Sequence, residues 1–185
     1  MHLPPSAGVL TLLCGLSFSG KSTLATQLAA QLDAEVISLD SINLERGLDG
    51  GQGIPLEEWA ATNRIAEERV RALLGQHHQV IVDDTGSPRF IRDGWRDVAS
   101  STGSRFVLVW VQIDEPLLRQ RLQANRSARS RHDVTDDVLA GHLAEFEPPT
   151  DENAITIRAT ETRDPQRIHD IAQFLRGSLP NKLAR

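Results

Sequence analysis

The chain has 185 residues, of which 39% are apolar, 24% charged and only 4% aromatic. This profile is typical of one soluble globular domain with a sizeable core, and it excludes disordered chain, collagen and coiled coil. The formal net charge of −5 excludes an overall positive field for nucleic acid or an anionic membrane. No repeat or composition break divides the sequence, so we expect a single domain over residues 1–185.

Cysteine usage and the apolar runs indicate the compartment. The single cysteine, Cys14, has no partner for an internal disulfide, and we interpret it as a small core residue in a reducing environment. The first apolar run, residues 9–14, is too short for a signal segment or a membrane span. The sequence therefore predicts a cytoplasmic protein that does not associate with membranes.

Apolar runs rich in branched residues alternate with stretches at helical spacing. The runs predict buried strands, and the stretches between them predict helices. The predicted strands are 9–14, 35–39, 79–82, 105–113 and 154–159, and the predicted helices are 22–32, 55–74, 88–100, 115–125, 135–146 and 165–176. This alternation indicates an α/β fold with a parallel sheet covered by helices on both faces, and ligands at the carboxyl ends of the strands.

A phosphate-binding motif follows the first predicted strand directly. Residues 15–22 read G-L-S-F-S-G-K-S and precede an apolar-periodic helix, which is the complete P-loop spacing in its required setting. The glycines allow the backbone to wrap a phosphate chain, and the helix N-terminus faces the anion. Lys21, the one lysine before the tail, would reach the outer phosphates, and the Ser22 hydroxyl would ligate Mg²⁺. We expect ATP and Mg²⁺ as cofactors. The residues assigned to the nucleotide are Gly15, Ser17, Ser19, Gly20, Lys21, Ser22 and Thr23.

Carboxylates follow the second and third predicted strands. Asp40 comes after residues 35–39, where it would share a cleft with the P-loop and accept a proton from an attacking hydroxyl. The alternative is that Asp40 caps a short turn over 41–46. Asp83 and Asp84 end the third strand, and we favour Asp84 as the residue that serves the metal or the substrate, the other capping the following loop.

Basic side chains gather between residues 119 and 131, where no acidic residue interrupts them. Guanidinium groups delivered by a mobile loop stabilise the charge that spreads over a transferring phosphoryl group. The segment therefore predicts an arginine-rich lid over about 126–134, with Arg126 as the first choice for the acting residue and Arg129 or Arg131 next. A solvated helix face is the alternative, which we expect for Arg119.

Taken together, these motifs resemble the P-loop kinases related to polynucleotide 5′-hydroxyl kinase and chloramphenicol phosphotransferase, often described as AAA-type ATP-binding proteins. The resemblance covers roughly residues 9–160. It implies a five-stranded parallel sheet in the order 2-3-1-4-5, with Asp40 as general base, Lys21 and Arg126 as catalytic cations, and Ser22 and Asp84 as metal ligands. The substrate-binding residues assigned with it are Asp84, Arg46, Arg89 and Arg129.

One position departs from that family. Polynucleotide kinases of this group carry an arginine three residues after the base, and here that position is Asn43. The glycine-rich segment that follows, within a flap over about 46–58, has no density of cations and suits a small acceptor. Trp59 would line the acceptor pocket or, as we favour, occupy a core position.

The sequence thus predicts an ATP:hydroxyl phosphotransferase acting on a small molecule or nucleoside. A polynucleotide 5′-hydroxyl kinase is the alternative within this class. A nucleotide-dependent ATPase switch or binding module is the alternative from another class, because a P-loop alone does not separate the two. Nothing in the sequence indicates the oligomeric state.

Overall fold

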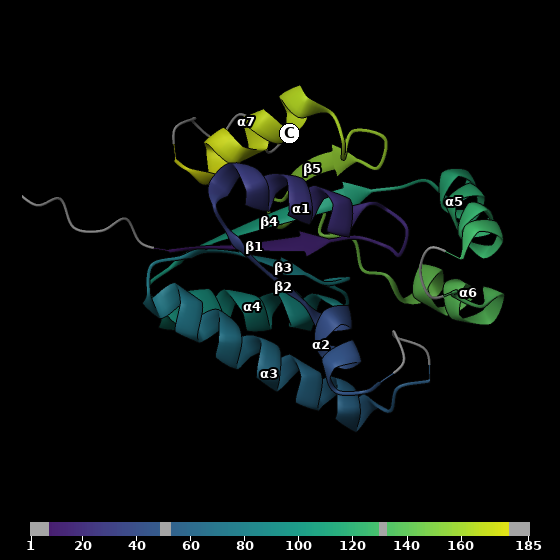
Figure 1. The fold of residues 1–185 in the computed structure, drawn as a ribbon, viewed down its shortest axis with the longest axis horizontal. Coiled ribbons are helices and arrows are strands. Elements are labelled where there is room, and N and C mark those ends of the chain that lie inside the picture. Colours follow the sequence, from purple (N-terminus) through teal and green to yellow (C-terminus); the bar gives the residue numbers. More distant parts are fainter. Residues whose placement is uncertain (1–7, 49–52, 130–132, 178–185) are drawn as a thin grey trace, which may run out of the picture.

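A computed structural model describes residues 8–48, 53–129 and 133–177. The described chain alternates strands and helices around one sheet (Figure 1). Its strands are β1 (Val9–Cys14), β2 (Glu35–Ser38), β3 (Gln79–Asp83), β4 (Arg105–Gln112) and β5 (Ile155–Arg158). Its helices are α1 (Lys21–Leu32), α2 (Leu39–Glu45), α3 (Leu56–Gly75), α4 (Arg89–Ser101), α5 (Glu115–Ala128), α6 (Asp136–Glu145) and α7 (Pro165–Leu175).

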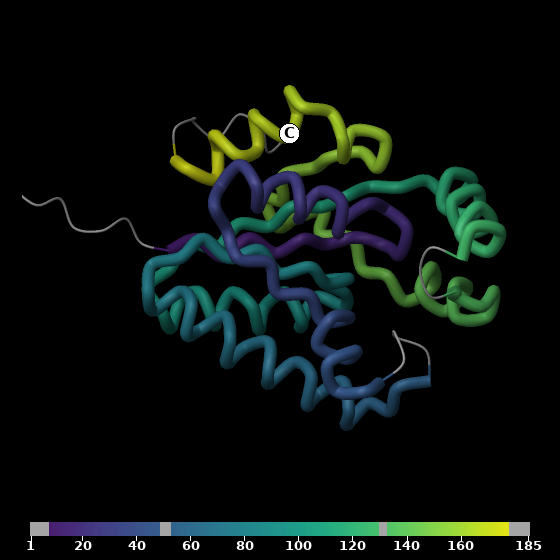
Figure 2. Tube along the Cα trace, in the orientation of Figure 1, coloured from purple at the N-terminus to yellow at the C-terminus, as the bar shows by residue number. Residues whose placement is uncertain are grey.

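All strand pairs are parallel, and the strand order is β2-β3-β1-β4-β5, which confirms the expected fold. Helices α1 and α7 lie on one face of the sheet, while α3 and α4 lie on the other (Figures 1 and 2). The period-two alternation of the strands explains this layering. On β1, for example, Val9 and Leu13 pack beneath α1 and α7, whereas Leu10 and Leu12 pack toward α3 and α4.

The register of the central strands decides where the functional groups meet. Asp83 at the end of β3 pairs with Leu13 on one side and with Ser38 on the other. The P-loop after β1, Asp40 after β2 and Asp84 after β3 therefore emerge at the same edge of the sheet. This is the carboxyl edge at which open α/β sheets bind ligands.

Helices α5 and α6 stand beyond that edge and have a small apolar cluster of their own (Figure 1). Phe18, at the tip of the P-loop, is buried in this cluster with Leu118 and Leu122 of α5 and Leu139 of α6. Phe18 adopts a left-handed φ of 63°. Helices α5 and α6 therefore share an apolar cluster with the P-loop.

Two boundaries differ from the sequence prediction by more than one residue. Residues 39–45 form the helix α2, where only a short turn over 41–46 was expected. Helix α5 continues to Ala128, into the predicted lid, and ends at Arg129 in a left-handed C-cap conformation with a φ of 49°. None of the helices in the described part of the chain combines the length and apolar character that a membrane span requires.

Candidate active site

The P-loop connects β1 to α1 with two glycines in conformations that a side chain would strain. Gly15 has a φ of 152°, and a Cβ there would lie 2.5 Å from the carbonyl oxygen of Val111. Gly20 has a φ of 105°, and a Cβ there would lie 2.8 Å from Oγ1 of Thr162. The glycine spacing of the motif therefore allows the loop to lie directly against β4 and against the segment that follows β5.

Lys21 begins α1 with its ammonium group turned back over the loop. Its Nζ donates to the carbonyl oxygens of Gly15 at 2.8 Å and Leu16 at 3.0 Å. The backbone amide of Gly15 donates to the carbonyl oxygen of Thr85 at 3.0 Å, which fixes the loop against the end of β3. A cation, a helix N-terminus and a loop anchored at both sides form a site suited to a polyphosphate.

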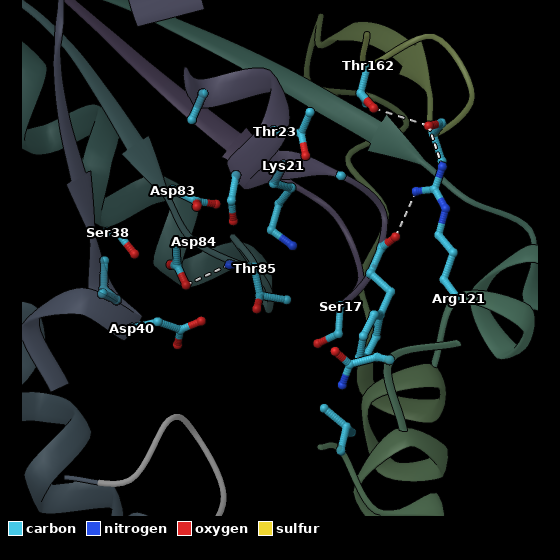
Figure 3. A pocket seen from close by; sticks show the side chains of 18 of the residues that line it. Ser17, Lys21, Thr23, Ser38, Asp40, Asp83, Asp84, Thr85, Arg121 and Thr162 are labelled. Carbon is cyan, nitrogen blue, oxygen red and sulfur yellow. Dashed lines mark hydrogen bonds between the residues drawn. The ribbon is translucent and has the colours of Figure 1, made fainter. Parts of the chain in front are cut away.

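A cavity of about 1210 Å³ opens at this edge of the sheet (Figure 3). Its size exceeds the roughly 300–1,000 Å³ of ordinary ligand pockets, which suits a site for two substrates. The P-loop residues that line it are Ser17, Phe18, Gly20, Lys21, Ser22 and Thr23. Gly15 and Ser19, which we also assigned to the nucleotide, are buried within the loop instead of lining the cavity. The Oγ atom of Ser19 is a buried hydroxyl without a protein hydrogen-bond partner in the described chain.

Asp40 lines the same cavity from the first turn of α2. The interpretation of Asp40 as a helix cap is wrong, because Ser38 occupies the N-cap and its Oγ accepts from the amide of Ser41 at 3.3 Å. The side chain of Asp40 is exposed, and Figure 3 shows it on the same side of the cavity as Asp84. The expected base thus has access to an acceptor.

Asp83, the last residue of β3, and Asp84, the residue that follows it, both line the cavity. Burial raises the pKa of Asp84, while a hydrogen bond from the Thr85 amide at 2.7 Å and the charge of Lys21 oppose the rise. The cavity therefore contains a desolvated carboxylate within the electrostatic reach of the P-loop lysine. This is typical of functional sites.

Mg²⁺ fits the donors present at this edge. The hydroxyl of Ser22 and the carboxylate of Asp84 both line the cavity, and Mg²⁺ is usually held by one or two such protein oxygens together with substrate phosphates. The described residues contain no cluster of three or more histidine, cysteine, aspartate or glutamate side chains that would hold a metal by themselves. A metal at this site would therefore depend on the nucleotide for further ligands.

Arg121 is the basic residue of α5 that lines the cavity. It lies on the inward face of the helix with Leu118, Leu122 and Asn125, which are buried. Its guanidinium donates to the carbonyl oxygens of Phe18 at 2.9 Å and Ala159 at 2.8 Å, so it joins the P-loop to the segment after β5 (Figure 3). Burial lowers the pKa of Arg121, and the charge of nearby Arg163 lowers it further.

The lid arginine favoured from the sequence lies elsewhere. Arg126 does not line the cavity, and its guanidinium pairs with Asp133 at 3.0 Å and Asp136 at 2.9 Å. It is five positions beyond Arg121, which turns it toward the opposite side of α5. Arg129 is exposed and outside the cavity lining, and Arg131 lies outside the described residues. The sequence analysis did not single out Arg121, although its spacing with Leu118 and Leu122 places the three residues on one face of α5.

Two further arginines predicted to bind substrate have structural partners. Arg46 donates to Thr62 Oγ1 at 2.7 Å and pairs with Glu58, so it joins α2 to α3 without lining the cavity. Arg89 is exposed on α4, also outside the lining, and its backbone amide donates to Glu147. Their substrate-binding roles find no support in the geometry.

Asn43, at the position where related polynucleotide kinases carry an arginine, is fully buried between α2 and α3. Its Oδ1 accepts from Thr62 Oγ1 at 2.5 Å, while its Nδ2 has no protein partner among the described residues. Position 43 is therefore part of the α2–α3 interface and does not reach the cavity.

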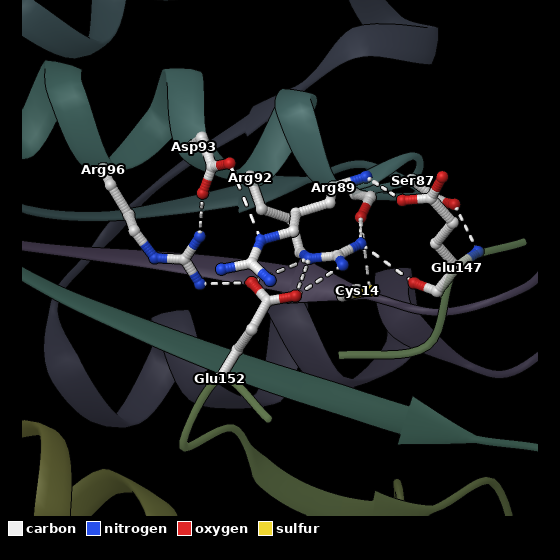
Figure 4. Close-up of polar contacts among 9 residues, drawn as sticks. Cys14, Ser87, Arg89, Arg92, Asp93, Arg96, Glu147 and Glu152 are labelled. Atoms are coloured by element: carbon white, nitrogen blue, oxygen red, sulfur yellow. Dashed lines mark hydrogen bonds and ion pairs between the residues drawn. The ribbon is translucent and has the colours of Figure 1, made fainter. Parts of the chain in front are cut away.

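A buried ionic cluster supports the loop after β3 from behind (Figure 4). Arg92 of α4 pairs with Glu152 at 2.5 Å, and their side chains are only 1% and 4% exposed. The guanidinium of Arg92 also donates to the carbonyl oxygen of Gly86 at 2.6 Å. Gly86 in turn packs on Cys14 at the end of β1, where an added Cβ would lie 3.1 Å from that of Cys14. The cluster thus fixes the turn that carries Asp84 against the strand that carries the P-loop.

The cavity also has lining residues that were not assigned from the sequence. Among them is His142 of α6, and burial lowers the pKa of its imidazole against the opposing charge of Glu145. Thr162 and Arg163 line it from the segment after β5. Trp59 of α3 both lines the cavity and packs against the core beneath α3 and α4, so the two interpretations of this residue hold together.

Comparison with protein families matches residues 10–149 to the AAA domain model. The chain belongs to the AAA domain family. A curated relative, the tRNA dimethylallyltransferase of Sorangium cellulosum, is 42% identical over 158 residues, which cover 78% of this chain and 48% of that protein. The tRNA dimethylallyltransferase 1 of Pelobacter propionicus is 41% identical over 51 residues, or 28% of this chain and 16% of that protein. The chain spans about half the length of these relatives or less.

Solved structures show the same fold at low sequence identity. Chaetomium thermophilum Kti12 in complex with ADP-AlF3 has a TM-score of 0.72 at 17% identity, covering 92% of this chain and 99% of that chain. Mycobacterium tuberculosis APS kinase CysC in complex with AMPPNP and APS has a TM-score of 0.65 at 21% identity, covering 95% and 98%. A gluconokinase from Sinorhizobium meliloti has a TM-score of 0.60 at 17% identity, covering 95% and 93%. The chain therefore shares its fold with these three proteins.

Proposed function

We propose that this AAA domain protein is an ATP-dependent phosphotransferase that moves the γ-phosphoryl group to a hydroxyl of a small molecule or nucleoside. The observation that carries the proposal is that Asp40 and Lys21 line one cavity from different elements. A P-loop alone would suit any nucleotide-binding protein, whereas a carboxylate that lines the same cavity as the P-loop lysine suits the activation of a hydroxyl.

In the proposed reaction, Asp40 accepts the proton of the acceptor hydroxyl while its oxygen bonds to the γ-phosphorus. The bond from that phosphorus to the oxygen bridging the β- and γ-phosphates breaks, and the products are a phosphate monoester and ADP. Lys21 and the N-terminus of α1 counter the charge on the phosphate oxygens. Ser22 and Asp84 would hold Mg²⁺, which supplies further charge neutralisation when bound. Arg121 keeps the P-loop against the segment after β5.

Asp40→Asn tests this assignment, because it removes the proton acceptor and preserves the shape of the side chain. We expect ATP binding to persist and phosphoryl transfer to fall by roughly 10²–10⁴-fold, the usual contribution of a positioned base. Glu45→Gln is the matched control, since Glu45 is an exposed residue of the same helix outside the cavity lining. Full transfer to an identified acceptor by Asp40→Asn would show that the base has been misassigned.

A polynucleotide 5′-hydroxyl kinase remains the alternative acceptor class. The buried position of Asn43 and the pairing of Arg46 with Glu58 leave these residues without an obvious route to a nucleic-acid phosphate. Incubation with a 5′-hydroxyl oligonucleotide and with nucleosides separates the two. Preferential phosphorylation of the oligonucleotide would favour the polynucleotide class.

Two other functions are motivated by the similar proteins. The likeness to Kti12 with bound ADP-AlF3 favours a nucleotide-dependent switch, in which γ-labelled ATP would yield only free phosphate in the presence of every acceptor. The 42% identity to a tRNA dimethylallyltransferase favours transfer of a dimethylallyl group to tRNA. That reaction would label tRNA from a dimethylallyl donor and leave the γ-phosphate of ATP in place.

A further inference from the structure

The walls of the cavity differ in charge. Among the described residues, its arginine and lysine side chains are Lys21 of the P-loop, Arg121 of α5 and Arg163 of the segment after β5. The wall across from the lid, formed by α2 and the end of β3, presents the carboxylates Asp40, Asp83 and Asp84. The polyphosphate of ATP suits the basic part. The acceptor must therefore approach along the wall that carries the carboxylates.

Apolar side chains extend the same wall. Val36 of β2 and Leu44 of α2 line the cavity while remaining 38% and 55% exposed, and Trp59 of α3 lies with them in the lining. Apolar groups left exposed around a functional cavity are typical of surfaces that receive the apolar part of a ligand. The acceptor wall thus combines an aromatic and aliphatic surface with carboxylates at the reacting end.

Among the described residues, the arginine that follows α2 is bonded to other groups. Arg46 bonds to Glu58 and Thr62 between α2 and α3 and does not line the cavity. The lid side of the cavity contributes the apolar Val134 and Val138. It also contributes His142, whose pKa burial lowers from its ordinary 6.5.

We infer that the acceptor is a hydroxyl compound without a phosphate or carboxylate group, and that it presents an apolar or aromatic face to Leu44 and Trp59. This inference rests on the proposed phosphotransfer. A carboxylate or phosphate on the acceptor would approach like charges on Asp40 and Asp83, and it would call for the bidentate guanidinium contacts that usually recognise such groups. An uncharged or amine-bearing alcohol meets neither difficulty.

The inference is tested with the full chain, ATP and Mg²⁺ on two series of acceptors. Within each series, the acceptors present the reacting hydroxyl in the same surroundings and differ in the charge of one other group. One series is 2-phenyl-1,3-propanediol, 3-amino-2-phenylpropan-1-ol and 3-hydroxy-2-phenylpropanoate. The other is thymidine, its 3′-amino analogue and its 3′-phosphate. We expect kcat/KM for the neutral or amine member to exceed that of the anionic member at least tenfold. An anionic member that reacts equally well or better overturns the inference.

Leu44→Arg tests the role of the wall directly, because it places a cation in the cavity lining. It should raise kcat/KM for the anionic acceptors about tenfold and lower it for the amine-bearing ones. Leu56→Arg is the matched control, since Leu56 is 85% exposed at the start of α3 and does not line the cavity. An equal effect of the two substitutions would show that the specificity does not arise at this wall.

Fluorescence quenching gives a readout that needs no turnover. The component of quenching lost in Trp59→Phe reports the ions that reach the acceptor wall. Quenching by each ion is divided by its quenching of free N-acetyltryptophanamide, because iodide quenches indole more efficiently than caesium. We expect the normalised quenching by caesium to exceed that by iodide, with Leu44→Arg reversing the order. A higher normalised quenching by iodide in the unmodified protein overturns the inference. If caesium is favoured and γ-labelled ATP transfers phosphate to none of the acceptors, the proposed function fails while the charge of the wall stands.

Discussion

Replacing Glu152 by glutamine tests whether the ionic cluster behind the β3 loop stabilises the fold. The substitution keeps the size of the side chain and removes the charge that faces Arg92 and Arg96. Because the Arg92 side chain is only 1% exposed, its guanidinium would remain buried without its counter-charge. Breaking a buried pair in this way costs about 3–5 kcal/mol of unfolding free energy. For a domain of this length, that corresponds to a fall in Tm of roughly 6–20 °C.

Urea denaturation and thermal unfolding of Glu152→Gln would measure the loss. Glu115→Gln is the matched control, because Glu115 pairs with Arg119 on the surface of α5 with both side chains more than half exposed. Such a pair is worth about 0–1 kcal/mol. Unfolding free energies of the two variants that agree within about 1 kcal/mol would refute the argument that burial makes the Arg92–Glu152 pair important.

The same variant predicts how stability responds to acid. Burial alone would raise the pKa of Glu152, but hydrogen bonds from Arg92 and Arg96 outweigh it and hold the pKa below its ordinary value of 4.5. A carboxyl whose pKa is lowered on folding stabilises the protein above its unfolded pKa, and the contribution is lost as the pH falls through the folded pKa. The stability difference between Glu152→Gln and the unmodified protein should therefore be largest near neutral pH and shrink below pH 4.5. A difference that grows on acidification contradicts this assignment.

Three further predictions concern residues around the P-loop. Asp84→Asn should stabilise the fold at pH 7 by roughly 0.5–2 kcal/mol, because the raised pKa of Asp84 shows that burial disfavours its charge. The same substitution should lower the rate of phosphoryl transfer. A destabilised variant with full activity would contradict both expectations. Burial raises the pKa of the Cys14 thiol to about 12. A thiol-specific disulfide reagent at pH 8 should therefore modify Cys14 only after the protein unfolds. Rapid modification of the folded protein would show that the thiol is accessible. Gly15→Ala should abolish nucleotide binding, because its Cβ would lie 2.5 Å from the Val111 carbonyl oxygen. Gly94→Ala, in open space within α4, should instead stabilise the fold by about 0.5–1 kcal/mol. Calorimetric ATP titration would measure nucleotide binding, and urea denaturation would measure stability. Equal behaviour of the two variants would refute the steric argument.

Local chemistry determined the phosphate cradle and the order of the elements. The residues of the P-loop act through their own backbone and the helix that follows, so spacing alone was sufficient to predict the loop at 15–22. Alternating strands and helices require a parallel sheet, and that part of the fold was predicted from the residues alone. The strand order 2-3-1-4-5 came from the family resemblance and is confirmed by the pairing of the strands.

Side-chain direction on the lid and the partners of buried charges were decided by tertiary structure. Arg121 and Arg126 are both arginines of one helix, and only the packing of α5 on Phe18 turns Arg121 toward the cavity. Arg46 pairs with Glu58 and Thr62 because α2 packs against α3. No local sequence pattern in the flap indicates that packing.

The ionic cluster behind the loop after β3 also depends on tertiary structure. Arg92 and Glu152 are 60 residues apart in the chain, and their pairing depends on the fold that brings α4 beside the segment before β5. Interactions within one loop or one helix turn can be predicted from sequence because the chain itself fixes their distances. Interactions between elements depend on how the whole core packs, and that is the information that the tertiary structure added.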